Sequence, residues 1–390
     1  MKFKSIFSLF ICCFFFACTP KNSVPTVTDV KVKQTVTPYE SVERASRWTM
    51  ETGKKPKNII FMIGDGMGIT QISAGLYSNG NKLFLEKFPV IGLHKCYAGN
   101  DLVTDSAAAA TAMAAGVKTY NGAIGVDMDT VAVRMILEEA ESKGMPTGLV
   151  ATSTIVHATP ASFAAHVKQR KMYEDIALDM SNSGVDLMIG GGKKYFDRRE
   201  DDKNLYKELE AKNYVVSDYF QQDFKDVSVK SNQNFAYFTN DDDPLPVAQG
   251  RDYLIPASTF AADFLNQKDT QEKGFFLMIE GSQIDWGGHA NKSDYIVSEM
   301  IEFDNAIGKI LAFAEQDGET LVVVTADHET GGYAINKGST MDSLVTKFTS
   351  DYHTADLIPV FAYGPGAELF GGIYENTAIY HKMREAFGFE

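Results

Sequence analysis

Short apolar runs that alternate with helical patterns constrain the fold of this chain more than any other feature, and they begin at residue 58. The apolar runs typical of buried strands lie at 58–63, 147–151, 185–189, 275–279, 320–325 and 358–362. The helical patterns lie at 106–115, 131–143, 160–182, 257–267, 293–315 and 375–387. Thr130 stands at the expected N-cap of the second of these helices, and Gly144 follows its end. Apolar strands that alternate with helices indicate an α/β domain built around a largely parallel sheet.

The first residues have the pattern of an export signal. Lys2 and Lys4 precede the apolar run IFSLFICCFFFAC, which is too short to cross a bilayer but suits the core of a signal peptide. We expect a signal peptide over 1–17 and a lipoprotein acceptor cysteine at Cys18, with ordinary signal cleavage nearby as the alternative. Residues 18–50 are polar and predict a lipid-anchored tether. The expected location is therefore outside the cytoplasm of a bacterium, in the periplasm or anchored to the outer membrane.

The charge balance limits the classes of molecule that this protein can bind, and the cysteine count limits the disulfides that it can form. The chain has 37 Lys and Arg against 51 Asp and Glu, a formal charge of −14, and no basic run, so we predict no nucleic-acid partner. Once the signal is removed, Cys96 is the only cysteine that carries no lipid, and we expect no internal disulfide. The folded domain is expected over 51–390, with 193–250 as a peripheral insertion.

Polar side chains follow three of the expected strands, at the points where those strands end. Asp65 lies in the segment IGDGMG, Glu280 closes the strand FFLMI, and Asp327 and His328 follow the strand TLVVVT. Each alone has an ordinary reading as a turn or a capped loop. Open α/β sheets build their sites outside the carboxyl ends of the strands, so the three together predict one constellation.

Further ligand-type residues lie in two other segments. The segment EGSQIDWGGHAN adds Asp285 and His289, which share one face if the segment is helical, and His353 lies just before a strand. A carboxylate with an imidazole suits zinc. His94 and His381 have no such context and are interpreted as structural or surface residues.

The segment VTDSAAAATAMAAG at 103–116 allows two interpretations. Asp105 or Ser106 can cap a helix by accepting from its first backbone N–H groups, and the alanines favour that helix. Ser106 is also a candidate nucleophile, because a bound divalent cation can hold a serine hydroxyl in its ionised form. The two roles are compatible.

Six blocks of the sequence resemble, in order, the signature blocks of the alkaline phosphatase family. They are NIIFMIGDGMG, VTDSAAAATAMAAGVKTYNGAIGVD, HATPASFAAHVKQR, EGSQIDWGGH, VTADHETGGY and YHTADLIPVFAYGPG. The blocks run from about residue 57 to the C-terminus. The resemblance implies an α/β three-layer sandwich with a large, mostly parallel central sheet flanked by helices. It also implies an enzyme that hydrolyses small phosphate monoesters to an alcohol and inorganic phosphate.

The resemblance further implies two zinc ions and one magnesium ion, with Asp65 bridging between the second zinc and the magnesium. The first zinc would be held by Asp285, His289 and His353. The second zinc would be held by Asp65, Asp327 and His328, and would also bind the Ser106 oxygen. Magnesium would be held by Asp65, Thr159 and Glu280.

Other roles follow from the same resemblance. Ser106 would attack phosphorus and form a phosphoserine, Arg170 would clamp two phosphate oxygens, and Asp105 would orient that arginine. His166, placed one helical turn before Arg170, is interpreted as a structural buttress.

Two positions near the magnesium site depart from some members of the family. His157 and Trp286 stand where those members carry an aspartate and a lysine, whereas other members carry histidine or tryptophan. Imidazole suits zinc better than magnesium, so we expect magnesium to bind loosely. The neutral tryptophan is expected to loosen the phosphate product.

Two alternative functions remain at this point. Sulfatases of the same superfamily need a C/S-x-P-x-R context, whereas Ser106 is followed by three alanines. A phosphodiesterase-type relative is less favoured, because such enzymes generally lack the magnesium set and the clamp arginine. A non-catalytic lipoprotein that captures phosphate or zinc is the alternative from another class, and the intact nucleophile argues against it. A homodimer is expected by analogy with the family.

Overall fold

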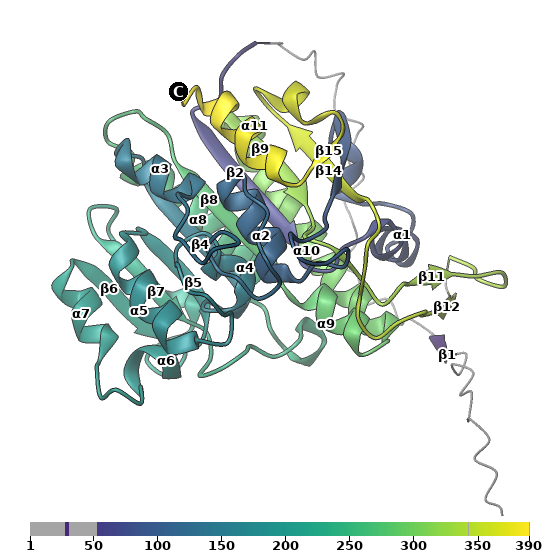
Figure 1. Ribbon diagram of the computed structural model, residues 1–390, viewed down its shortest axis with the longest axis horizontal. Helices are drawn as coiled ribbons and strands as arrows, with labels where there is room; N and C mark the ends of the chain where they lie inside the picture. The colour runs from purple at the N-terminus through teal and green to yellow at the C-terminus, as the bar shows by residue number, and fades with distance from the viewer. Residues whose placement is uncertain (1–27, 31–52, 342, 390) are drawn as a thin grey trace, which may run out of the picture.

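The computed structural model describes residues 28–30, 53–341 and 343–389 (Figure 1). The signal peptide expected over 1–17 and most of the tether expected over 18–50 lie outside these residues. None of the helices in the described part of the chain is both long and apolar enough to cross a membrane.

A ten-stranded sheet forms the centre of the molecule (Figure 1). In spatial order its strands are β15 (Gly372–Glu375), β3 (Val90–Lys95), β14 (Ile358–Tyr363), β9 (Thr320–Thr325), β2 (Asn58–Gly64), β8 (Phe276–Gly281), β4 (Thr147–Thr154), β5 (Leu187–Gly191), β7 (Asn234–Phe238) and β6 (Tyr214–Asp218). Strand β14 runs antiparallel to both of its neighbours, and every other pair in this sheet is parallel. The predicted mostly parallel sheet is confirmed.

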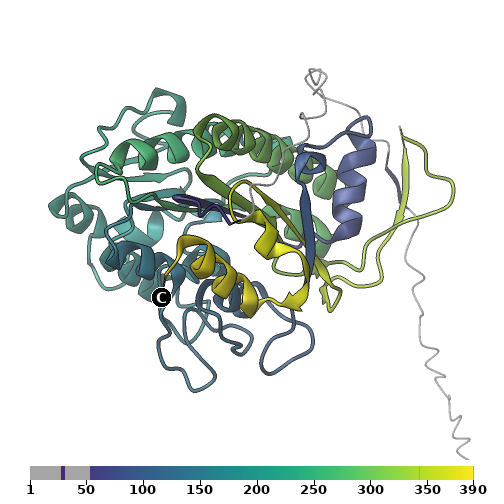
Figure 2. The same cartoon turned by 90° about the horizontal axis from the view of Figure 1, so that it is seen from above.

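Helices cover both faces of the sheet, which confirms the three layers (Figure 2). One face carries α1 (Ile69–Ser78), α8 (Leu254–Lys268) and α10 (Ser293–Asp317). The other carries α2 (Ser106–Ala115), α3 (Ile136–Ser142), α4 (Ala158–Ala161), α5 (Tyr173–Ser183), α6 (Lys194–Asp197), α7 (Leu205–Ala211) and α11 (Thr377–Phe387). Helix α9 (Gln283–His289) follows β8 directly.

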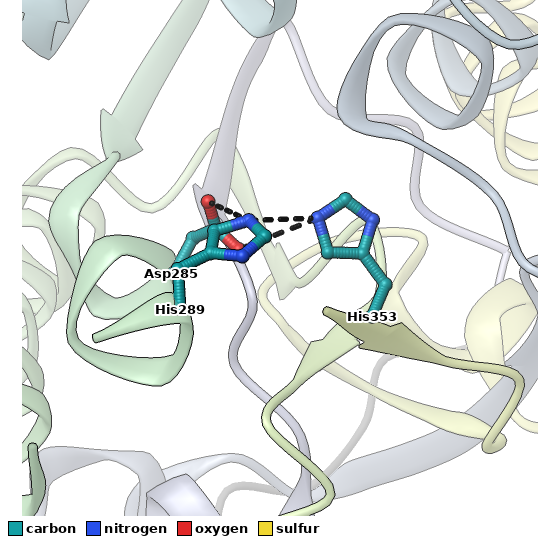
Figure 3. A group of neighbouring side chains, drawn as sticks. All are labelled: Asp285, His289 and His353. Carbon is teal, nitrogen blue, oxygen red and sulfur yellow. Dashed lines mark hydrogen bonds and ion pairs between the residues drawn. The ribbon is translucent and has the colours of Figure 1, made fainter. Parts of the chain in front are cut away.

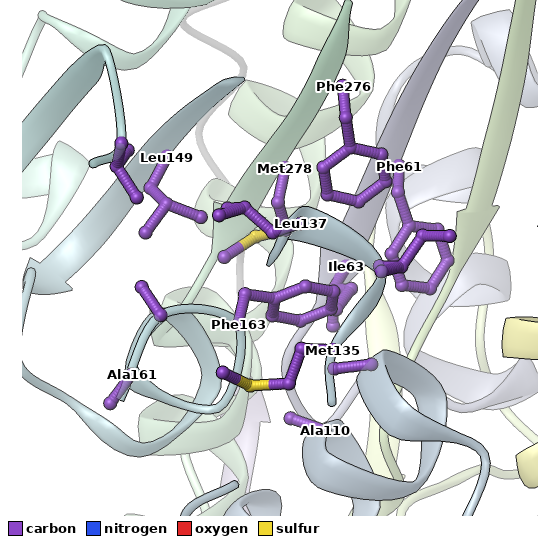
Figure 4. Close-up of a cluster of buried hydrophobic side chains, with 14 of the residues drawn as sticks. Phe61, Ile63, Ala110, Met135, Leu137, Leu149, Ala161, Phe163, Phe276 and Met278 are labelled. Atoms are coloured by element: carbon purple, nitrogen blue, oxygen red, sulfur yellow. The ribbon is translucent and has the colours of Figure 1, made fainter. Parts of the chain in front are cut away.

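The middle of each central strand is largely apolar because the strand serves two cores. In β2, Ile59 and Phe61 belong to the core under α2 and α3, whereas Ile60 belongs to the core under α8 and α10. Side chains alternate between the faces of a strand, so a strand buried on both sides is apolar at most positions on both faces. Figure 4 shows the first of these cores, in which the ring of Phe163 lies 6.0 Å from that of Phe61 and 6.1 Å from that of Phe276.

The remaining elements are short. The 3-10 helices are η1 (Phe84–Lys87), η2 (Phe224–Asp226), η3 (Val247–Gln249) and η4 (Ala367–Phe370). A three-stranded sheet contains β1 (Thr28–Val30), β12 (Leu344–Lys347) and β11 (Ala334–Ile335), and a two-stranded sheet pairs β10 (Glu329–Thr330) with β13 (His353–Thr354). The segment 193–250 contributes α6, α7, η2, η3 and the two strands at one edge of the central sheet.

Two of the predicted helices are wrong in extent. The helix predicted over 131–143 begins only at Ile136, after the N-cap Met135. Thr130 is not a cap: it has φ of 63° and donates its N–H to the carbonyl oxygen of Asp127 in a turn. The backbone N–H of Val133 donates to the carbonyl oxygen of Gly125, eight residues earlier. This non-helical hydrogen bond keeps residues 131–135 out of the helix.

The helix predicted over 160–182 is interrupted. Only α4 and α5 are helical, and the residues between them run along the segment 122–124. Val167 N–H donates to the Ile124 carbonyl at 2.9 Å, and Arg170 N–H donates to the Gly122 carbonyl at 2.7 Å. These non-local bonds replace helical ones, so His166 and Arg170 do not share a helix as predicted.

Candidate active site

Four adjacent strands of the central sheet carry expected site residues at or just after their carboxyl ends. Asp65 follows β2, Glu280 lies in β8, and Asp327 follows β9. His157 and Thr159 follow β4. Because these strands are parallel neighbours, their carboxyl ends lie together, as in other open α/β sheets.

The first group of ligand-type side chains joins Asp285 and His289 of α9 to His353 of β13 (Figure 3). Asp285 and His289 are four residues apart on one helix face, as predicted, and their Oδ2 and Nε2 atoms are 3.4 Å apart. His353 Nε2 lies 3.1 Å from His289 Nε2 and 3.6 Å from Asp285 Oδ1. All three side chains therefore direct a donor atom at one point. The hydrogen bond to Asp285 raises the pKa of His289 to about 9, and burial lowers the pKa of His353 to about 4.

The second group is fully buried and contains Asp65, Asp327 and His328. His328 Nε2 lies 3.1 Å from Asp327 Oδ2 and 3.6 Å from Asp65 Oδ1. The same nitrogen lies 3.3 Å from the Ser106 Oγ atom. The candidate nucleophile thus borders this group.

The third group contains Asp65, His157 and Glu280. Thr159, which the family resemblance implies as a ligand of the same ion, is buried beside them. His157 was expected only near this site, whereas its ring offers a nitrogen within 4.8 Å of both carboxylates. Burial, followed by the Arg170 charge, lowers the pKa of His157 to about 3 and keeps the imidazole neutral.

Several buried polar atoms at these groups have no hydrogen-bond partner among the residues that the structure describes. They include both carboxylate oxygens of Asp65, Glu280 Oε1, Thr159 Oγ1 and His157 Nδ1. Burial and the neighbouring carboxylates raise the pKa of Asp65 well above its usual value, and burial raises that of Glu280 to about 8. Orphaned buried acceptors are costly, and divalent cations would satisfy them and offset the crowded negative charge. The donor sets therefore fit metal ions.

Asp105 and Ser106 occupy the start of α2. Asp105 is the N-cap, with its Oδ1 accepting from Ala108 N–H at 2.9 Å, and Ser106 is the first helical residue. The cap is thus the aspartate and not the serine. Its other oxygen, Oδ2, accepts from Arg170 Nη1 at 3.0 Å. Ser106 is 2% exposed, at a helix end whose free N–H groups favour an anion.

Residues around the site fix its geometry. The His166 ring pairs with the Gly125 carbonyl at 2.7 Å and with Glu138 at 2.9 Å, which holds the loop that leads to Arg170. The Trp286 ring lies edge-on to His157, with 6.1 Å between centroids. His94 is buried, with its Nε2 paired to the Ala326 carbonyl at 2.9 Å.

One residue that the sequence analysis missed contacts two of the groups. Thr330 Oγ1 donates to Asp285 Oδ1 and lies 3.2 Å from His328 Nδ1. Thr330 and His328 are two residues apart in ADHETGG, the spacing that places side chains on one side of an extended chain. That spacing was the available signal.

Comparisons with known proteins agree on one family. The family model described as alkaline phosphatase matches residues 56–348. Alkaline phosphatase 3 of Bacillus subtilis is 34% identical, covering 92% of this chain and 96% of the relative, and alkaline phosphatase of Escherichia coli is 32% identical, covering 86% and 87%. The solved alkaline phosphatase of the Antarctic bacterium TAB5 has a TM-score of 0.81 and 44% identity, covering 86% of this chain and 99% of that one. A histidine-to-aspartate mutant of that enzyme has been solved with Mg bound in its M3 site.

Proposed function

Because the chain belongs to the alkaline phosphatase family and is thus a metal-dependent phosphomonoesterase, we propose that it hydrolyses small phosphate monoesters through a phosphoserine at Ser106. The observation that carries the proposal is the position of Ser106 Oγ, 3.3 Å from His328 Nε2 at the start of α2. A serine placed between a ligand group and a helix N-terminus is suited to attack an anionic ester.

Arg170 binds and orients the phosphate in this proposal. Asp105 accepts one guanidinium N–H, which fixes the plane of the fork and leaves further N–H groups for two phosphate oxygens. Asp105 also caps α2, so one carboxylate positions the Arg170 guanidinium relative to Ser106 at the start of that helix.

Ser106 Oγ loses its proton to solvent and forms a bond to phosphorus, while the bond between phosphorus and the ester oxygen breaks. The ester oxygen takes up a proton from solvent, and the alcohol leaves. In the second half, a water oxygen attacks phosphorus and the bond to Ser106 Oγ breaks, so Ser106 recovers a proton and inorganic phosphate leaves. The attacking and leaving oxygens lie roughly in line in each half. The backbone N–H groups at the start of α2 face the phosphate oxygens throughout.

We propose two zinc ions at the first two groups and one magnesium ion at the third. Asp285, His289 and His353 offer two imidazoles and one carboxylate, a set that suits zinc. When bound, the ions supply Lewis-acid stabilisation of negative charge on the entering and leaving oxygens. The third group is dominated by oxygen donors, which suits magnesium, although His157 Nδ1 is directed into it.

We further propose that magnesium binds this third group loosely. A neutral imidazole neither adds negative charge nor accepts hydrogen bonds from the waters of magnesium as a carboxylate does. The mutant of the TAB5 enzyme that carries an aspartate in place of a histidine, with Mg in its M3 site, supports the link between that side chain and the ion.

Monoesters are favoured over diesters as substrates. A diester would carry a second alcohol on one of the phosphate oxygens, and the proposed clamp by Arg170 needs two oxygens that are free to accept hydrogen bonds. We also propose that the protein is exported and held at the membrane by a lipid on Cys18, and that it forms a homodimer as an analogy with the family suggests.

The test of the proposal is to trap the intermediate. Protein quenched in acid during turnover of p-nitrophenyl phosphate should carry one added phosphoryl group on the peptide that contains Ser106, as seen by mass spectrometry. The Ser106→Ala protein should carry none. Rapid hydrolysis without any phosphorylated peptide in either protein would contradict the covalent route.

A further inference from the structure

Three aromatic rings form a stack that runs from the second ligand group to the protein surface. The rings of His328 and His353 are 3.5 Å apart between centroids and inclined by 16°. The ring of Tyr352 continues the stack at 4.3 Å from His353, inclined by only 8°. The buried histidines belong to ligand groups already described, whereas Tyr352 is 48% exposed. An exposed aromatic ring thus borders the first ligand group.

The backbone holds Tyr352 in place from both sides. Its carbonyl accepts from Gly331 N–H at 2.9 Å, and its own N–H donates to Ser350 Oγ at 2.9 Å. The neighbouring Asp351 carbonyl pairs with His289 Nδ1 at 2.7 Å. A ring fixed in this way can contact a ligand without a further loss of conformational freedom, which favours binding.

Tyr352 lies on the side of the site from which the leaving group must depart. Ser106 borders the second group, and an in-line displacement sends the ester oxygen away from the serine, toward the first group. His353 and His289 of that first group are the imidazoles nearest to Tyr352, at 4.3 Å and 5.9 Å between ring centroids. The alcohol part of the substrate therefore leaves past this ring.

Two other exposed apolar side chains lie on segments that are close in sequence to His353 or to its partner Thr104. His353 Nδ1 pairs with the Thr104 carbonyl at 2.7 Å, which joins His353 to the loop that carries Leu102. Leu102 is 70% exposed and Leu357, four residues after His353, is 40% exposed. Exposed apolar side chains thus lie on both of the segments that meet at His353.

We propose that Tyr352 contacts the leaving group and gives the enzyme a preference for phosphate monoesters of aryl alcohols over those of small alkyl alcohols. The inference rests on the proposed function and adds a substrate class to it. An aromatic leaving group can stack on or abut the fixed ring, whereas an ethyl group offers little surface. The Tyr352 hydroxyl is not required for this contact, so phenylalanine should replace tyrosine.

The first experiment compares kcat/KM for phenyl phosphate and ethyl phosphate in four proteins. These are the wild type, Tyr352→Ala, Tyr352→Phe and, as a control, Phe220→Ala, which removes another exposed ring in the edge segment of the sheet. Tyr352→Ala should lower the ratio of the two constants by roughly 2- to 10-fold. Tyr352→Phe and Phe220→Ala should keep the wild-type ratio. An equal loss for both esters, or no loss for either, would overturn the proposal.

The second experiment measures binding without turnover. In the Ser106→Ala background, Tyr352→Ala should raise the Kd of benzylphosphonate by a similar factor and leave that of butylphosphonate unchanged, as measured by calorimetry. Equal shifts of both constants, or none, would overturn the role of Tyr352. Failure of the wild type to hydrolyse either ester would instead contradict the proposed function, and the phosphonates would still report on the ring.

Discussion

Arg170 Nη1 lies 3.0 Å from Asp105 Oδ2, and the Asp105 carboxylate also accepts from Ala108 N–H at the start of α2. One carboxylate therefore connects the candidate phosphate clamp to the helix that presents Ser106. The connection matters because a bidentate clamp depends on the orientation of its plane and not only on its charge.

Replacing Arg170 by lysine should weaken the binding of phosphate. The change keeps the charge but turns a two-pronged donor into a point charge, so we expect the inhibition constant of inorganic phosphate to rise roughly 10-fold, the effect of losing about one charge-assisted hydrogen bond. Arg134→Lys, at an exposed arginine bonded to Ser142, is the matched control. An unchanged inhibition constant would remove Arg170 from the clamp.

Replacing Ser106 by alanine should abolish most turnover and leave the metal content intact. The six carboxylate and imidazole side chains of the first two groups remain in this variant, so elemental analysis should give the same zinc per chain as in the wild type. Activity near the wild-type level would show that another group attacks phosphorus.

Replacing His157 by aspartate should tighten magnesium at the third group. The carboxylate adds negative charge beside Asp65 and Glu280 and replaces the nitrogen donor now directed there. Chelator-treated wild type and variant are titrated with magnesium, with activity and calorimetry as readouts. Equal midpoints would show that His157 does not tune the site.

The His166–Glu138 pair should make stability depend on pH. The hydrogen bond to Glu138 raises the pKa of His166, and His166 in turn lowers that of Glu138 against the effect of burial. Stability from the raised histidine pKa is complete below its unfolded value and is lost as the pH rises through its folded value.

The melting temperature of His166→Gln should therefore differ from that of the wild type more at about pH 6 than at about pH 9. His381→Gln, at a histidine whose ring lies edge-on to that of Tyr380, serves as the comparison. A difference that does not change with pH would assign the whole effect of His166 to neutral hydrogen bonds.

The lipid anchor can be tested by fractionation. If Cys18 is lipidated, the wild-type protein should sediment with membranes, and Cys18→Ser should release it or block its processing. The Cys96→Ser variant controls for loss of a thiol, since Cys96 is buried in the folded domain. Wild type recovered entirely in the soluble periplasmic fraction would contradict the anchor.

The sequence predicted the sheet and the approach of the ligand residues for one shared reason. Strands such as β9, at 320–325, are apolar on both faces, so their ends are marked by the first polar residues that follow them. Asp327 and His328 could be placed at the sheet edge from this pattern alone.

The interrupted helix could not be predicted in the same way. Its residues have helical periodicity, but Val167 and Arg170 donate their N–H groups to a segment more than 40 residues earlier in the chain. Local propensity is overridden by such distant partners. The contact of Thr330 with Asp285 likewise joins residues that lie 45 positions apart in the chain.

The two-residue ladder between β10 and β13 has a consequence for how this protein can vary. It pairs Thr330 with His353 and so closes the base of the excursion that carries β11 and β12, which projects from the body of the molecule (Figure 2). Lengthening a loop beyond a closed base costs little, about 0.6 kcal/mol for each doubling. The ladder thus allows the arm, the segment that carries β11 and β12, to vary in evolution independently of the active site. The arm can change in sequence, lengthen or accept a grafted module while His353 keeps its place.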